Sequence, residues 1–227
     1  MIPTSAKEVK TLGWDYIDVI LFTGDAFIDH PSFGTAVIAR WLQKHGYRVA
    51  VVPQPNWRDD LRDFRELGAP RLYFGVNAGA MDSMVNHYTA AKRLRSDDAY
   101  TPEGKAGQRP DYAVTVYTRI LKQIYPDIPV VIGGIEASLR RVTHYDYWQD
   151  KIKRSVLCDS QADLLIYGMG ERAITEIVTR LGNGEDISEI TDVKGTCYLT
   201  KNIDNLTDYI MLPSFEEICE SKNKYAK

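Results

Sequence analysis

The stretch IDVILFT, residues Ile17 to Thr23, decides the fold class of this 227-residue chain. It is almost entirely apolar, and Gly24 and Asp25 follow it directly. Because helices cover both faces of a parallel sheet, a strand in the middle of such a sheet is apolar on both sides. The stretch therefore predicts a central strand of a parallel sheet, followed by a turn.

The same cycle of strand, turn and helix recurs along the chain. The apolar stripe of residues 32–45 predicts a helix that ends at Gly46. Further strands are expected at 48–52, 71–76, 129–132, 163–167 and 195–200, and further helices at 59–67, 111–125 and 171–181. Alternating strands and helices predict a three-layer, flavodoxin-like α/β fold with an open, mainly parallel sheet. The expected strand order is 2-1-3-4-5, and the last stretch adds an extra edge strand.

Two segments do not follow this cycle. Residues 201–227 are polar and irregular, so we expect a domain over 1–200 and then a linker toward a domain that this chain lacks. Residues 86–110 are rich in Lys, Arg, Asp, Gly and Pro and show no periodicity. Connections longer than about 12–15 residues are usually functional or disordered. We therefore expect this segment to cover a site or a partner, with simple disorder as the alternative.

Composition narrows the class of protein. The 28 basic and 31 acidic residues give a net charge of -3, so no overall field attracts nucleic acid or acidic membranes. No apolar run approaches the roughly 20 residues that cross a bilayer, and the N-terminus lacks a secretory signal. Cys158, Cys197 and Cys219 form neither a disulfide pattern nor a CxxC metal motif. We expect a cytoplasmic protein with no membrane contact and no metal site.

Glycines follow four of the expected strands, and this position is where open parallel sheets bind ligands. Helix N-termini present free N–H groups there, and glycine lets a ligand approach the backbone because it has no Cβ. The alternative is that the glycines only permit the turn from strand to helix. The residues that we expect to line a ligand crevice are Gly24, Asp29, His30, Asn77, Gly79, Gly133, Gly134, Glu136 and Gly170.

Asp29 and His30 lie in the loop after the first strand. A histidine beside a carboxylate suits acid–base chemistry or metal ligation. The alternative is that Asp29 or Ser32 caps the next helix while His30 forms a local hydrogen bond. We prefer capping because no second histidine lies nearby, and we assign no catalytic residue.

Arg140, Arg141 and Tyr145 form a second group of candidates, after Gly133 and Gly134. Arginine binds phosphate and carboxylate through paired hydrogen bonds. We interpret the three residues as contacts to an anion or to another domain. The alternative is a solvated basic turn with aromatic side chains packed on the sheet. The basic residues at 151, 153 and 154 leave contact with nucleic acid open.

Four long strings resemble the N-terminal region of YgiQ-type radical SAM proteins. They are IDHPSFG (28–34), MDSMVNHYTAAKRLRSDDAYTPEG (81–104), GIEASLRRVTHYDYWQDKIKRS (134–155) and YGMGERAITEI (167–177). The resemblance implies a domain related to cobalamin-binding domains, placed ahead of a radical SAM barrel. In that family a CxxxCxxC motif in the barrel holds a [4Fe-4S] cluster that cleaves S-adenosylmethionine. This chain lacks the motif, so the resemblance implies an accessory fragment that is inactive alone.

The resemblance to cobalamin-binding domains is incomplete. Their DxHxxG motif supplies a histidine to cobalt, but here Asp29 is adjacent to His30 and Gly34 follows four residues later. The Gly133-Gly134 pair does resemble the family's glycine pair near the nucleotide tail of the cofactor. The leading hypothesis is an accessory domain whose crevice binds a small molecule or docks against its own radical SAM barrel. A non-catalytic interaction module and a phospho-ligand binder are the alternatives.

Overall fold

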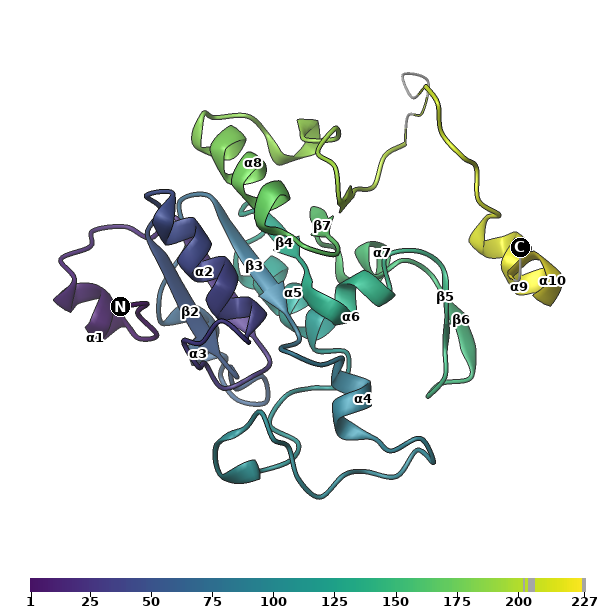
Figure 1. Cartoon of the computed structure of the whole chain (residues 1–227), viewed down its shortest axis with the longest axis horizontal. Helices are drawn as coiled ribbons and strands as arrows, with labels where there is room; N and C mark the ends of the chain where they lie inside the picture. The colour runs from purple at the N-terminus through teal and green to yellow at the C-terminus, as the bar shows by residue number, and fades with distance from the viewer. Residues whose placement is uncertain (202, 204–206, 226–227) are drawn as a thin grey trace.

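A computed structural model describes residues 1–201, 203 and 207–225 of the chain. Its main sheet has the strand order β2-β1-β3-β4-β7-β8 (Figure 1). The strands are β1 (Val19–Thr23), β2 (Val49–Pro53), β3 (Tyr73–Asn77), β4 (Val130–Ile132), β7 (Leu164–Ile166) and β8 (Thr196–Cys197). All neighbours are parallel except β8, which runs antiparallel to β7. The predicted fold class, strand order and extra edge strand are confirmed.

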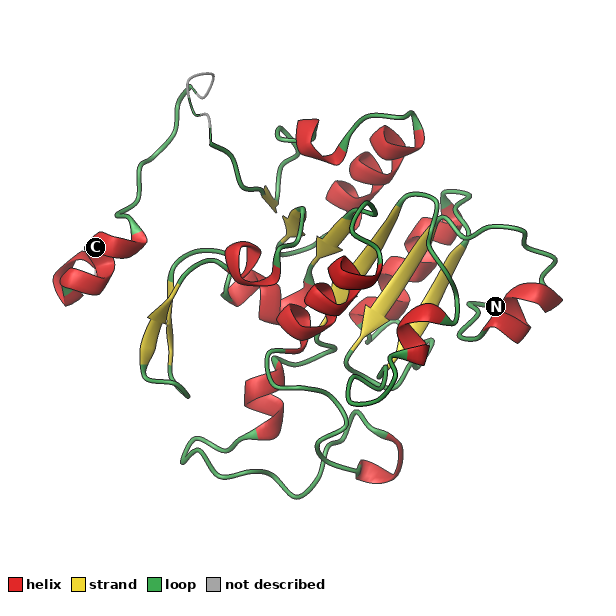
Figure 2. Cartoon of the chain, turned by 180° about the vertical axis from the view of Figure 1, so that it is seen from behind, coloured by secondary structure: helices red, strands yellow, loops and turns green. Residues whose placement is uncertain are grey.

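Helices cover both faces of the sheet, which explains the apolar character of its strands (Figures 1 and 2). One layer consists of α2 (Gly34–Lys44) and α8 (Glu171–Gly182). The other consists of α3 (Arg62–Arg65), α5 (Ala113–Ile124), α6 (Gly134–Leu139) and α7 (Val156–Ser160). Successive side chains of a strand point to opposite faces. In β1, Val19 and Leu21 accordingly pack with α2 and α8, whereas Ile20 and Phe22 pack with the α5 layer.

The long helices lie close to their predicted positions, and Gly46 has the left-handed φ of 89° expected after the end of α2. The helix expected at 59–67 is shorter, because α3 covers Arg62–Arg65 alone. The Asp59 carboxylate accepts a hydrogen bond from the Leu61 N–H at 2.9 Å, and Asp60 accepts one from the Arg62 N–H. These local bonds hold the chain in turns where a helix would otherwise begin.

Several short elements give no recognisable period in the sequence. They are α1 (Ala6–Thr11), α4 (Ser83–His87), the antiparallel pair β5 (His144–Asp146) and β6 (Lys151–Lys153), the 3-10 turns at Pro102–Gly104 and Ile187–Glu189, α9 (Phe215–Glu220) and α10 (Lys222–Tyr225). None of the described helices has the length and hydrophobicity of a membrane span.

The expectation of irregular chain after residue 201 is wrong for α9 and α10. Ser214 and Glu217 form a capping box at the start of α9, a signal that the sequence carries. Residues 202, 204–206 and 226–227 of the expected linker lie outside the described residues. The domain boundary at residue 200 therefore stays a prediction.

Candidate functional site

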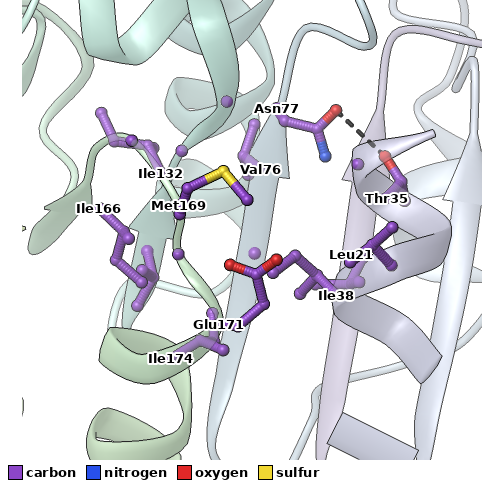
Figure 3. A pocket seen from close by; sticks show the side chains of 18 of the residues that line it. Leu21, Thr35, Ile38, Val76, Asn77, Ile132, Ile166, Met169, Glu171 and Ile174 are labelled. Atoms are coloured by element: carbon purple, nitrogen blue, oxygen red, sulfur yellow. Dashed lines mark hydrogen bonds between the residues drawn. The ribbon is translucent and has the colours of Figure 1, made fainter. Parts of the chain in front are cut away.

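A pocket of about 350 Å³ opens at the carboxyl ends of β1, β3, β4 and β7 (Figure 3). This volume is within the range of small-molecule sites. Its floor includes Leu21, Gly75 and Val131, which lie side by side on neighbouring strands. Leu21 extends across Gly75, where an added Cβ would be 2.5 Å from the Leu21 Cδ2. A side chain at position 75 would therefore force Leu21 to move from its place on the floor.

The walls of the pocket are mostly apolar. Ile38 comes from α2 and Ile174 from α8, the two helices that pack on this face of the sheet. Figure 3 shows their side chains around the same space as those of Ile132, Ile166 and Met169. Apolar walls of this kind favour a flat or aliphatic part of a ligand, because its burial removes apolar surface from water.

Asn77 at the end of β3 provides an oriented polar group (Figure 3). Its Oδ1 accepts hydrogen bonds from the Thr23 hydroxyl at 2.9 Å, the Thr35 hydroxyl at 3.3 Å and the Gly79 N–H at 2.9 Å. A backbone N–H can only donate, so this atom must be the amide oxygen. The amide nitrogen of Asn77 is therefore the group that remains to donate to a ligand.

Two helix N-termini border the pocket. Gly34 begins α2 and Glu171 begins α8, and both residues lie on the pocket wall. Neither helix has a side-chain hydrogen bond at its N-cap. Their first N–H groups are thus available to water or to a ligand.

The structure brings part of the predicted crevice together. Asn77, Gly79, Gly133, Gly134 and Gly170 lie on the pocket wall. Gly79 has a φ of +107°, and a Cβ there would lie 2.0 Å from the Asp25 carboxylate. Gly134 has a φ of +79°, so a side chain would be strained at the start of α6.

Gly24, Asp29 and His30 lie outside the pocket wall. Gly24 lets the turn after β1 lie close to the turn after β3, because a Cβ there would be 2.2 Å from the Ala78 carbonyl oxygen. Asp29 forms an exposed ion pair with Arg40. His30 accepts a hydrogen bond from the Ser32 N–H at its Nδ1, 3.1 Å away, which confirms the expected local bond.

The capping interpretation for this loop is wrong. The N-cap of α2 is Phe33, and no side chain caps it. The local turn of Ile28, His30 and Phe33, held by backbone bonds, places Phe33 rather than Asp29 or Ser32 at this position.

Glu136 also lies outside the pocket wall, buried between helices. Its Oε2 accepts from the Ser83 N–H at 2.8 Å and its Oε1 from the Val114 N–H at 2.9 Å. These donors belong to the first turns of α4 and α5, and α5 has no side-chain hydrogen bond at its own N-cap. Burial raises the pKa of the Glu136 carboxyl. The side chain therefore joins two helix N-termini from inside the protein.

Arg140, Arg141 and Tyr145 are separate from the pocket wall. Arg140 is buried and forms an ion pair with Asp82, and burial lowers the pKa of its guanidinium. Arg141 lies over the Tyr167 ring, 5.0 Å from its centre.

Tyr145 lies on β5 and donates its hydroxyl hydrogen to Asp150 at 2.5 Å. Its backbone N–H donates to the Tyr225 hydroxyl in α10 at 3.2 Å. The structure therefore places Tyr145 against the C-terminal helices.

Arg109 is the main feature that the sequence analysis missed. Its side chain is fully buried and lies 2.7 Å from Asp25 Oδ1 and 3.0 Å from Asp98 Oδ2. It also donates to the Ala78 carbonyl at 2.8 Å. Burial raises the pKa of Asp25. Burial acts in the same direction on Asp98, but the Tyr100 N–H and Arg109 outweigh it and lower its pKa.

Arg109 therefore holds segment 86–110 to the strand-end turns, and the Ala26 N–H also donates to the Tyr100 carbonyl of the segment at 2.9 Å. Its interior contains two short antiparallel bridges, Tyr88 with Leu94 and Asp97 with Lys105. Nothing in the sequence distinguishes Arg109 from the other basic residues of the segment. Among the described residues, no three His, Cys, Asp or Glu side chains are grouped so that they could hold a metal ion.

The family described as Radical SAM N-terminal matches residues 1–227 of the sequence. The chain belongs to this family. UPF0313 proteins are similar to this Radical SAM N-terminal chain at 56% identity in Bacteroides thetaiotaomicron, 64% in Porphyromonas gingivalis and 51% in Geobacter sulfurreducens. The matches cover 99%, 87% and 100% of the chain. They cover 38%, 31% and 37% of those relatives, so the chain spans about a third of their length.

Among solved structures, this Radical SAM N-terminal chain resembles the radical S-adenosylmethionine methyltransferase TsrM from Kitasatospora setae. The structure of TsrM with cobalamin and a [4Fe-4S] cluster bound matches with a TM-score of 0.53 at 20% identity. The match covers 82% of this chain and 28% of TsrM. A second TsrM structure, with tryptophan and a SAM analogue, gives a TM-score of 0.51 at 21% identity over 81% of this chain and 28% of TsrM. At this identity the similarity shows the fold alone.

Proposed function

We propose that this chain is an accessory domain of a radical SAM enzyme and that its strand-end pocket binds a small, partly apolar ligand. The apolar pocket of about 350 Å³ beside β1 and β3, where the strand order reverses, carries the proposal. Open parallel sheets bind ligands at this point. We place the [4Fe-4S] cluster and the S-adenosylmethionine chemistry of the family in the part of the full-length protein outside this chain.

Cobalamin is a candidate ligand because the similar TsrM structure has it bound. The pocket suits the flat base of its nucleotide tail, since Ile38 and Ile174 supply apolar walls and Gly133 and Gly134 add no bulk. His30 does not suit the cobalt, whose chemistry is to carry alkyl groups. The Nδ1 of His30 accepts from the Ser32 N–H, so Nε2 carries the proton of the neutral ring and has no lone pair for cobalt. Asp29 pairs with Arg40 instead of orienting the ring. We therefore propose that cobalamin binds through its tail and that His30 does not ligate the cobalt.

Comparison of three probes tests the pocket. Hydroxocobalamin has the nucleotide tail, cobinamide lacks it, and adenosine supplies a flat base with a ribose but no corrin. Equilibrium dialysis and visible absorption should show retention of hydroxocobalamin without retention of cobinamide. Ile174→Phe, which fills the pocket, should weaken retention roughly tenfold, corresponding to about 1.4 kcal/mol. Binding of adenosine alone would favour a nucleoside ligand over cobalamin, and binding of none of the three would contradict the proposed pocket.

Exposed apolar side chains beside the pocket favour a second role, the docking of the radical SAM domain. Ile135 and Leu139 on α6 are 45% and 57% exposed, Val142 is 44% exposed and Met169 is 85% exposed. A group of this kind at one edge of a domain is typical of a surface that contacts another protein part. We propose that these residues, the α6 surface, contact the remainder of the full-length protein.

A further inference from the structure

Glu171 differs in charge from the rest of the pocket. Among the described residues of the wall it is the single ionisable side chain, and the wall has no Lys, Arg or His. Figure 3 shows its carboxylate between Met169 and Ile38. The side chain is half-buried, and no hydrogen bond or ion pair to its carboxylate is formed by the described residues. A carboxylate in this position faces the pocket without a hydrogen-bond donor from the described residues.

The opposite side of the pocket provides donors. The α2 N-terminus has no side-chain cap and no acidic residue in its first turn, so its positive end is uncompensated. The Asn77 amide nitrogen is a second donor group, and the three bonds to the amide oxygen fix its orientation. At α8, in contrast, Glu171 places a negative charge at the start of the helix. The pocket thus has a donor side at α2 and Asn77 and an acceptor side at Glu171.

We propose that Glu171 determines which group of the ligand lies at its end of the pocket: it accepts a hydrogen bond from an ammonium, amine or hydroxyl group and excludes an anionic group such as phosphate from that end. This inference rests on the proposed ligand pocket and goes beyond it by assigning the chemistry of one end of the ligand. A donor placed at Glu171 gives the carboxylate a hydrogen-bond partner, whereas an anion there meets a like charge beside apolar walls. The ligand therefore joins an apolar, flat body to a donor group.

A simpler role for Glu171 also exists. An acidic residue in the first turn stabilises a helix through its dipole without any ligand. Stability of α8 alone cannot separate the two roles. The two roles are distinguished by comparing the affinities of ligands that have the same shape and different charges.

Three aromatic fragments provide this series: benzylamine is a cation, benzyl alcohol is neutral and benzoate is an anion. The probe of binding is the ¹³C-labelled methyl group of Met169, which lies on the pocket wall. Met1, Met81, Met84 and Met211 lie elsewhere and serve as internal controls. Benzylamine should shift the Met169 signal with a Kd roughly tenfold lower than that of benzyl alcohol, and benzoate should bind more weakly still.

Glu171→Gln should abolish the advantage of benzylamine while the neutral fragment binds as before. Glu176→Gln is the matched control, because it makes the same change on the exposed side of α8, outside the pocket wall. Glu171→Asp should retain the order of the fragments. Circular dichroism establishes that each variant is folded, and the order of the fragments in the wild type needs no variant.

The outcomes separate two failures. Benzylamine binding no more tightly than benzyl alcohol in the wild type, or an unchanged order in Glu171→Gln, would overturn the role of Glu171. If no fragment moves the Met169 signal and the probes of the preceding section also fail to bind, the pocket itself is contradicted. The inference is supported if the affinities of the fragments follow their charge in the wild type and in Glu176→Gln but not in Glu171→Gln.

Discussion

At the scale of single residues, the role of a buried or half-buried carboxylate depends on which hydrogen-bond donors surround it. Glu136 follows a glycine turn at a strand end, a position that suits a ligand contact. Its two oxygens instead accept the N–H groups of Ser83 and Val114. Glu171, which follows a similar turn, faces the pocket without such partners. The two residues differ because the N-termini of α4 and α5 lie next to Glu136, whereas no helix N-terminus in the described part of the chain donates to the Glu171 carboxylate. The local sequence does not show which helix ends will lie nearby.

Glu136→Gln is expected to destabilise the domain by about 1–3 kcal/mol, because one acceptor oxygen becomes an amide nitrogen that faces an N–H group. Urea unfolding measures this free energy. Burial raises the pKa of Glu136 from 4.5, so the folded protein keeps this proton to a higher pH than the unfolded chain does. The contribution of the group is then complete below the ordinary pKa and declines as pH rises through the folded one.

The loss caused by Glu136→Gln should therefore be larger at about pH 4.5 than at about pH 8. Glu176→Gln, at an exposed position, is the matched control and should change stability by less than about 0.5 kcal/mol. A loss that grows with pH would show that the backbone donors, rather than burial, dominate the titration of Glu136.

At the scale of elements, strands and long helices were predictable because their apolar pattern is a local property. IDVILFT identifies β1, since a strand that is covered on both faces must be apolar throughout. The short elements α4, α6 and α7 have too few residues to show a period, and they are fixed by contacts between segments. Part of the pocket followed from strand-end glycines, whereas its apolar walls depend on how α2 and α8 pack.

Segment 86–110 is an element whose position depends on Arg109. Arg109→Met should destabilise the domain by about 3–5 kcal/mol, because it leaves the buried carboxylates of Asp25 and Asp98 without their cation. Urea unfolding should show this loss, and limited proteolysis should cut within 86–110 faster than in the wild type.

Arg93→Met is the control for Arg109→Met. Arg93 lies in the same segment with an exposed side chain, and loss of its charge should change stability by less than about 0.5 kcal/mol. Equal effects of the two substitutions would contradict the anchoring role of Arg109.

At the scale of the whole molecule, the pocket and the α6 surface adjoin each other at one edge of the sheet. Gly134 begins α6 and lies on the pocket wall, while Ile135 and Leu139 of the same helix are exposed. A domain that docks on this surface would cover the mouth of the pocket near Met169. Ligand binding and domain contact would then be coupled, since each changes the surroundings of the other.

Hydrogen exchange in the relative from Bacteroides thetaiotaomicron tests this docking. The backbone amides that match 134–142 and 167–170 should exchange roughly tenfold more slowly in the full-length protein than in its isolated N-terminal domain, because a contact restricts local opening. Amides that match α1, at the far end of the sheet in Figure 1, are the control and should exchange at equal rates. Equal rates in both regions would place the contact elsewhere. Slower exchange at 134–142 alone would mean that docking leaves the loop of Met169 free and the pocket open.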